Sequence, residues 1–182
     1  MPLSSTELHR LARSELGPLL APLGFRRSPG TSMASWARPA DDRWVVLWVQ
    51  PWRGTDAYAA GARFTVELRL SDAPAPGGGG LRRRLTLLLT DAEREEMRRL
   101  QNRVIAKLPP PDAATAQLLP PAAREHWLRE WKPRLAPYGR DEDVWFRHGV
   151  EDDVRAWLAF FARVLPGAID RFVESSLVRP AS

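Results

Sequence analysis

The strongest constraint on the fold is a pair of segments, 43–52 and 63–70, whose side chains alternate with the two-residue period of a β-strand. In the first segment both alternating faces are apolar, one rich in Trp and the other in Val and Leu. In the second, one face is apolar and the other carries Thr65, Glu67 and Arg69. A strand that is apolar on both faces requires cover on both, whereas the second segment requires cover on one face only. We therefore predict two paired strands inside a sheet.

Helical periodicity on either side of these strands supplies the cover. Apolar residues repeat at helical spacing from Ser5 to Ala21, and Ser4 with Glu7 has the form of a capping box. The broadest apolar face begins near Val150, and we expect Pro166 to kink that last helix or to separate off a final turn. A further helix is predicted over 90–107, where Thr90 with Glu93 again has the form of a capping box, and another over 122–135. Shorter strands are predicted over 24–27, 31–38 and 143–147.

The length and composition are those of one globular domain. The chain has 182 residues, of which 44% are hydrophobic and 27% charged, enough for a substantial core. We predict an α+β fold in which an antiparallel sheet of about four to five strands packs against N-terminal and C-terminal helices. Within the single domain 1–182, segment 1–72 forms a helix-plus-sheet core, 73–81 a flexible Pro/Gly linker, and 82–182 a mainly helical completion.

The sequence lacks the residues that several classes of function require. The chain has no Cys, which removes disulfides, thiolate metal sites and Cys nucleophiles, and it has no Gly-x-Ser-x-Gly elbow. Its three His lie on different elements, so we predict no metal site and no cofactor. No segment has the apolar length of a signal peptide or a membrane span, so we expect a cytoplasmic protein without a membrane partner. The Gly77–Gly80 run lacks the spacing of a phosphate-binding loop, and we interpret it as linker.

Acidic residues flank His148 on both sides, at 141–143 and at 151–153. A pair of these carboxylates could act in general acid–base catalysis. The interpretation that we favour is structural, because acidic residues at the start of a helix complement its dipole and acidic residues in a loop keep it solvated.

The chain is basic, with 27 Lys and Arg against 22 acids and a net charge of +5. Basic charge favours nucleic acid as a partner, but nearly all of these residues are Arg scattered among acids, as a GC-rich genome produces without selection for binding. The strongest phosphate-contacting candidates are Arg82, Arg83 and Arg84, with nearby Arg63 and Arg69. Surfaces that bind single strands interleave basic and aromatic side chains, and near this run the sequence offers only Phe64, which we expect in the core. We therefore favour a solvated linker end here.

The Trp-rich face of segment 43–52 has two interpretations. Trp44, Trp48 and Trp52 fit a core beneath a helix, which we favour. Alternatively they line a concave pocket or a partner groove in which Gln50 is the polar anchor. Trp52 is expected to be the most exposed of the three because it lies at the end of the strand. The candidate binding residues on this basis are Trp48, Gln50, Trp52, Arg53, Glu67 and Arg69.

A family resemblance rests on four pieces of the first half of the chain. They are Leu20–Arg27 (Leu-Ala-Pro-Leu-Gly-Phe-Arg-Arg), Trp36, Val45–Gln50 and Phe64–Leu68. In this order they resemble the bacterial domain-of-unknown-function family 4304. The family often has a Lys or Arg with Ser after the Gln, where this chain has Pro51-Trp-Arg. The resemblance implies a small bacterial α+β domain, and it carries over no catalytic residues.

Three hypotheses of function are consistent with these patterns. No assembled catalytic set is visible, so the first is a non-enzymatic protein-interaction module, of the accessory or immunity kind, with a protein partner. The second is an enzyme or nucleic-acid processor that uses Glu67, Arg69 and the region of Gln50 on the sheet face. The third is nucleic-acid binding through Arg82–Arg84, which predicts an affinity that falls steeply with salt.

Overall fold

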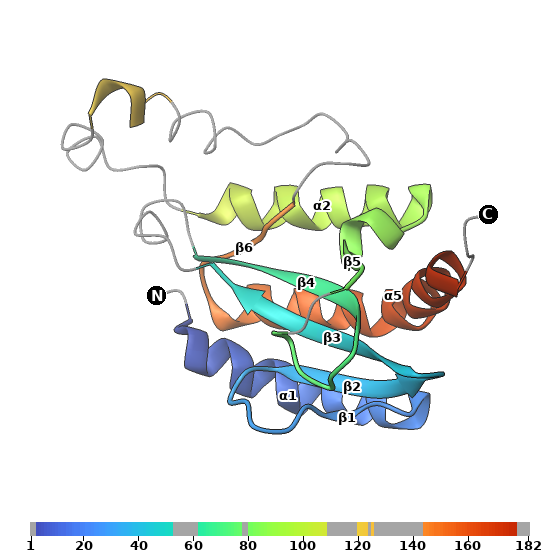
Figure 1. Ribbon diagram of the computed structural model, residues 1–182. Helices are drawn as coiled ribbons and strands as arrows, with labels where there is room; N and C mark the ends of the chain where they lie inside the picture. Colours follow the sequence, from blue (N-terminus) through green and yellow to red (C-terminus); the bar gives the residue numbers. More distant parts are fainter. Residues whose placement is uncertain are drawn as a thin grey trace.

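The computed structural model describes residues 3–52, 62–77, 80–108, 120–123, 125 and 144–177. Four predictions fall wholly or mainly on other residues: the binding residue Arg53, the middle of the Gly run, the acidic residues 141–143, and the helix over 122–135 beyond its first positions. The described part has helices at both ends of the chain and an antiparallel sheet between them (Figure 1). The predicted α+β fold class is therefore confirmed.

The sheet has six strands, and every pairing between them is antiparallel. The strands are β1 (Arg26–Arg27), β2 (Ser35–Ala40), β3 (Arg43–Pro51), β4 (Ala62–Ser71), β5 (Arg82–Arg84) and β6 (Phe146–His148). Strands β1 to β5 follow one another across the sheet in sequence order, and β6 pairs with β4. Because β3 occupies one edge of β4, the strands β5 and β6 divide the other edge between them, β6 at residues 62–64 and β5 at residues 67–69.

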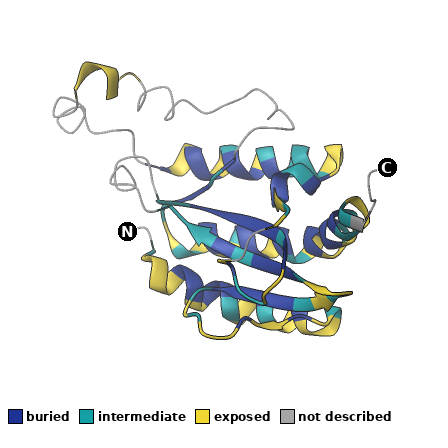
Figure 2. Ribbon diagram, in the orientation of Figure 1, coloured by how far each residue is buried: buried dark blue, intermediate teal, exposed yellow. Residues whose placement is uncertain are grey.

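Helices α1 (Ser5–Leu20) and α5 (Glu151–Leu177) cover one face of this sheet, behind it in Figure 1. The face that they cover presents Val45, Leu47 and Val49, all fully buried (Figure 2). Helix α2 (Asp91–Lys107) packs against β6 and α5. The aromatic centre of the core, with ring centroids 4.8 to 6.2 Å apart, consists of Phe64, Phe146, Trp157, Phe160 and Phe161.

The helix ends form as the sequence predicts. Ser4 and Glu7 make the reciprocal hydrogen bonds of a capping box at the start of α1, and Thr90 and Glu93 do the same for α2. A 3₁₀ turn, η1 (Ala21–Leu23), follows α1 and ends at Gly24, whose φ of 81° is the left-handed conformation that glycine adopts readily. Helix α5 continues through Pro166 to Leu177, so no separate final turn forms.

Two expectations about the faces of the sheet are wrong. The Trp side chains of β3 do not form the core beneath the helices, since Trp44 and Trp48 are half-buried and point to the opposite face from α1 and α5. The polar face of β4 is not solvated, because Thr65 and Glu67 are fully buried. Segment 43–52 therefore has two different sides. Helices cover its Val/Leu side, whereas its other side belongs to a face built largely of polar and aromatic residues.

The predicted linker over 73–81 packs against the sheet where the structure describes it. Pro76 is buried, and the Leu70 N–H donates a hydrogen bond of 2.8 Å to the carbonyl of Leu81. Gly80 has φ of 122°, and a Cβ at this position would lie 2.0 Å from the Leu70 carbonyl oxygen. Only glycine therefore fits where the chain passes β4 on its way to β5. The run Arg82–Arg84 then continues as a strand rather than as a solvated linker end.

Candidate functional site

The face of the sheet opposite α1 and α5 collects most of the binding residues predicted from the sequence. Side chains of neighbouring antiparallel strands that lie opposite each other share a face, so the register determines its members. Trp48 lies opposite Glu67, and Glu67 lies opposite Arg84. We call this surface the Arg–Trp face, and it consists of Trp44, Trp48, Gln50, Trp52, Arg63, Thr65, Glu67, Arg69, Arg82, Arg84, Trp145 and Arg147.

Glu67 lies at the centre of the Arg–Trp face and is only 2% exposed. Its Oε1 accepts a hydrogen bond of 2.9 Å from Arg69, and its Oε2 lies 3.8 Å from a terminal nitrogen of Arg84. The same nitrogen of Arg84 donates to Oε1 of Gln50 at 3.1 Å. A buried carboxylate requires such compensation, because desolvation of an unpaired charge costs several kcal/mol. Glu67 therefore fixes the positions of both arginines.

A continuous series of contacts between guanidinium groups and indole rings extends from Arg84 along the face. The Arg84 guanidinium lies 5.1 Å from the centre of the Trp145 ring. Trp145 contacts Trp52 edge to face, with ring centroids 4.9 Å apart, and the Arg63 guanidinium lies 4.2 Å from the centre of the Trp52 ring. Each cation–π contact contributes roughly 0.5–1 kcal/mol where it is exposed to solvent and more where it is not. Two adjacent indole rings thus lie between two guanidinium groups in one continuous contact series.

The buried polar atoms of this face that have no hydrogen-bond partner among the described residues include Nε1 of Trp48 and Oγ1 of Thr65. Trp48 lies beside Glu67 in the register, and Thr65 lies beside Gln50, so both atoms border the charged centre. A buried donor without a partner costs about 1–3 kcal/mol, and native structures rarely retain one unless water or a ligand meets it. The face therefore has hydrogen-bonding capacity beyond its own side-chain network.

Among the acidic residues near His148, Asp153 has the structural role predicted for it, at the start of α5. Oδ2 of Asp153 accepts hydrogen bonds from the N–H groups of Gly149 at 2.8 Å and Val150 at 3.2 Å, and so caps the start of α5. His148 itself is buried beside the Phe64 ring on the helix-covered face. Burial lowers the pKa of His148 to about 4, with Asp153 acting in the opposite direction. His148 thus lies away from the Arg–Trp face.

The structure brings together five of the predicted binding residues and separates others. Trp48, Gln50, Trp52, Glu67 and Arg69 all belong to the Arg–Trp face. From the basic run, the outer two residues join the same face, while the middle one, opposite Leu68, points to the other side.

Two residues of the face, Trp145 and Arg147, were missed by the sequence reasoning, which names Arg63 only as a neighbour of the basic run. Arg63 alternates with Thr65 and Glu67 along β4, so that signal was present in the sequence. Trp145 and Arg147 join only because β6 pairs with β4, and no local pattern specifies that pairing.

Within the described ranges, no three His, Asp or Glu side chains lie close enough together to hold a metal ion. In the same part of the chain, no helix combines the length and the apolar character that crossing a bilayer requires.

Comparison of the chain with protein-family models, with curated proteins and with solved structures gave no match. A function for this chain therefore has to be inferred from the geometry of its own residues.

Proposed function

We propose that this protein is a non-enzymatic interaction module that binds an acidic surface of a protein partner through the Arg–Trp face. The observation that carries the proposal is the contact series Arg84–Trp145–Trp52–Arg63, which a buried carboxylate holds at one end. Trp and Arg are the side chains most enriched at the energetic centres of protein interfaces. Among the residues that define the face, five arginines stand against the single carboxylate of Glu67, which favours a partner of opposite charge.

Preorganisation strengthens the case for binding. Ordering a flexible side chain at an interface costs about 0.5–1.5 kcal/mol, and a side chain that is already fixed avoids that cost. Arg69 and Arg84 are held by Glu67, and their side chains are only 15% and 18% exposed. The indole ring of Trp145 lies between Arg84 and Trp52. The face therefore presents its anchors in fixed positions.

The enzyme hypothesis receives less support from the same residues. Glu67, Arg69 and Gln50 make their described contacts within one ion-pair and hydrogen-bond network. A general base needs a carboxylate that can reach a substrate proton, and the 2% exposure of Glu67 leaves little surface for that contact. A network of this kind holds neighbouring side chains in position.

The test is affinity capture of a partner with matched variants. Tagged protein is incubated with nuclease-treated native lysate, and the captured proteins are identified by mass spectrometry. Trp52→Ala combined with Arg63→Gln removes one end of the series and should reduce capture of an acidic partner at least about tenfold, as loss of interface anchors does. Arg10→Gln is the matched charge control, because Arg10 is exposed on α1, away from the Arg–Trp face. Equal capture by both variants would remove this face as the binding surface.

A second candidate, single-stranded nucleic acid, is favoured by one specific observation. The expectation that the basic run lacks an aromatic neighbour is wrong, because Arg84 stacks on Trp145. Aromatic rings flanked by basic side chains suit a strand whose bases stack and whose phosphates pair with Arg. This candidate predicts quenching of Trp fluorescence by an oligonucleotide, with an affinity that falls steeply between low and moderate salt. An affinity independent of salt would exclude it.

A further inference from the structure

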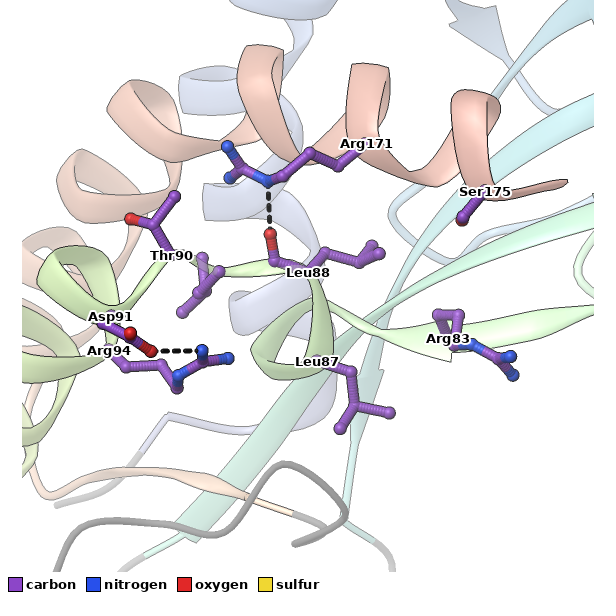
Figure 3. Close-up of a pocket in the computed structure, with 9 residues that line it drawn as sticks. Arg83, Leu87, Leu88, Thr90, Asp91, Arg94, Arg171 and Ser175 are labelled. Atoms are coloured by element: carbon purple, nitrogen blue, oxygen red, sulfur yellow. Dashed lines mark hydrogen bonds and ion pairs between the residues drawn. The ribbon is translucent and has the colours of Figure 1, made fainter. Parts of the chain in front are cut away.

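A hollow of about 500 Å³ opens on the side of β5 opposite the Arg–Trp face, between the start of α2 and the last turns of α5 (Figure 3). Its volume lies within the range of about 300–1,000 Å³ that is typical of small-molecule sites. Four elements contribute to its wall: β5, the 3₁₀ turn η3 (Leu85–Leu88), α2 and α5. The residues that line it are Arg83, Leu87, Leu88, Leu89, Thr90, Asp91, Arg94, Arg171 and Ser175. None of these belongs to the Arg–Trp face.

The charge in the wall of this hollow is mainly positive, with three arginines against Asp91. Arg171 is fixed by hydrogen bonds to the Leu88 carbonyl at 2.5 Å and to Oε2 of Glu93 at 2.8 Å. Arg94 donates to Oδ1 of Asp91 at 2.7 Å, as the dashed line in Figure 3 shows. A guanidinium has five N–H donors, and these contacts use one nitrogen of Arg94 and two of Arg171. Donors therefore remain for a ligand.

The arginines, rather than the end of helix α2, supply the donors. The capping box already occupies two N–H groups at the start of α2, since the Glu93 N–H donates to the Thr90 hydroxyl and the Thr90 N–H donates to the Glu93 carboxylate. Arg83 has its only described side-chain hydrogen bond at 3.2 Å to the carbonyl of its neighbour Arg82, and it is exposed. Guanidinium groups pair with carboxylate and phosphate through two parallel hydrogen bonds, which gives them a preference for these anions.

Three leucines form the apolar part of the wall, which also includes Thr90 and Ser175. Leu87 and Leu88 belong to η3 and Leu89 follows it, and Leu87 is half-buried at the hollow. In Figure 3 the side chains of Leu87 and Leu88 extend beside Arg83. Apolar surface beside fixed cations suits a ligand that has both an anionic group and a hydrocarbon part.

We propose that this hollow is a binding site for a small organic anion, in which an anionic phosphate or carboxylate group pairs with Arg83, Arg94 and Arg171 while a short apolar group contacts Leu87 and Leu88. The site is separate from the interaction surface proposed above, since Arg83 points to the opposite side of β5 from its neighbours Arg82 and Arg84. Failure of one proposal therefore leaves the other standing.

The test is an NMR titration of the full ¹⁵N-labelled chain with butyl phosphate, pentanoate and inorganic phosphate as probes. Butyl phosphate or pentanoate should shift the amide signals of residues 87–91 and 171–175. The better of the two organic probes should bind at least about tenfold more tightly than inorganic phosphate, because burial of a few methylene groups strengthens binding by that factor or more. The comparison of the two organic probes distinguishes a phosphate ligand from a carboxylate ligand.

Matched variants locate the site. Arg83→Gln with Arg94→Gln should weaken binding of the organic probe about tenfold or more, through loss of charge-assisted hydrogen bonds. Arg82→Gln, on the same strand but the opposite face, should leave binding unchanged. If the double variant fails to fold, the single Arg83→Gln retains the test, because Arg83 is exposed and bonds only its neighbour's carbonyl in the described structure. Equal binding of organic and inorganic probes, or equal weakening by Arg82→Gln, would overturn the proposal.

Discussion

At the scale of single residues, Glu67 occupies a position where an interior strand of a sheet commonly holds an apolar side chain. It is 2% exposed, and it contacts Arg69 and Arg84 on two adjacent strands. A buried ion pair is often no more stabilising than well-packed apolar residues of similar volume, so stability alone does not account for it. What accounts for a carboxylate at this position is that it holds two arginines in place on a surface rich in Trp.

Glu67→Gln should lower the free energy of unfolding by about 2–4 kcal/mol, because it leaves two partly buried arginines without their counter-charge. Urea denaturation followed by Trp fluorescence measures this quantity. Asp72→Asn, at an exposed position just beyond β4, is the control and should change it by less than about 0.5 kcal/mol. Equal midpoints for the wild type and Glu67→Gln would show that the carboxylate is not needed to hold the network.

His148 gives the protein a specific sensitivity to acid. Burial beside Phe64 lowers its pKa from 6.5 to about 4, while Asp153, which Lys107 also approaches at 3.9 Å, raises it. In the unfolded chain the imidazole takes up a proton near pH 6.5, whereas in the folded chain it stays neutral down to about pH 4. The unfolded state therefore binds more protons in this window, and stability falls as the pH falls.

Between pH 6.5 and pH 4 this single group should remove up to about 3 kcal/mol of stability, with full stability above pH 6.5. His148→Phe should abolish that part of the pH dependence. Thermal unfolding of both proteins across the range measures the difference, and comparison with the wild type cancels the contribution of the carboxylates. Parallel curves for the two proteins would contradict a neutral buried His148.

At the scale of elements, strand β6 is held in place by the Gln101 side chain of α2 as well as by its pairing with β4. Nε2 of Gln101 on α2 donates to the Trp145 carbonyl at 3.0 Å, and its Oε1 accepts from the N–H of Arg147 at 3.2 Å. One amide thus makes the two hydrogen bonds that a neighbouring strand would make along the outer edge of β6. It also fixes the backbone that carries Trp145 into the Arg–Trp face.

Gln101→Leu keeps the size of the side chain but leaves two backbone groups without partners, so it should cost about 2 kcal/mol of stability. Hydrogen exchange at the Arg147 amide should accelerate strongly in this variant, and NMR measures it directly. Asn102→Ala is the control on the same helix, because the Asn102 side-chain oxygen has no partner in the described structure. Unchanged exchange at Arg147 in Gln101→Leu would contradict the bridging role.

The elements that the sequence predicted are those whose signals are local. The capping boxes at Ser4 and Thr90 and the alternation in β3 and β4 each lie within a few consecutive residues, and all of them form as predicted. Strands β5 and β6 have three residues each, too short for a period to be established. What makes them strands is an open edge of β4, which is a property of the assembled sheet.

The residues of the candidate site divide in the same way, into those that local signals placed and those that depend on pairing between distant segments. Trp48, Gln50, Glu67 and Arg69 could be placed on one surface because they alternate along two strands predicted to pair. That the helices would cover the Val/Leu side rather than the Trp side could not be predicted, since both sides of β3 are apolar. The contribution of Trp145 depended on a partner distant in the sequence.

At the scale of the whole molecule, β4 pairs along its two edges with residues that lie at very different distances from it in the sequence. On one side Pro51 pairs with Phe64, a separation of 64 − 51 = 13 residues. On the other Phe64 pairs with Phe146, a separation of 146 − 64 = 82 residues. Long-range pairing has the larger entropic cost of loop closure, so we expect the β3–β4 hairpin to form before β6 docks.

This order of events predicts different kinetics for two core substitutions. Phe146→Leu should accelerate unfolding with little change in the folding rate, because its contacts form after the transition state. Val49→Ala, in the β3–β4 pair, is the counterpart and should slow folding. Stopped-flow measurements in urea give both rates. A folding rate reduced by Phe146→Leu as much as by Val49→Ala would show that β6 belongs to the folding nucleus.

The division of one strand edge between β5 and β6 has a consequence for synthesis. Until residues 146–148 have left the ribosome, residues 62–64 of β4 lack β6 on one side, while Phe64 pairs with Pro51 of β3 on the other. The open part includes Phe64, which is fully buried in the finished protein. An exposed apolar strand edge is a template for pairing with other chains. A nascent or prematurely terminated chain that stops short of β6 should therefore aggregate or recruit chaperones rather than persist as a smaller folded unit.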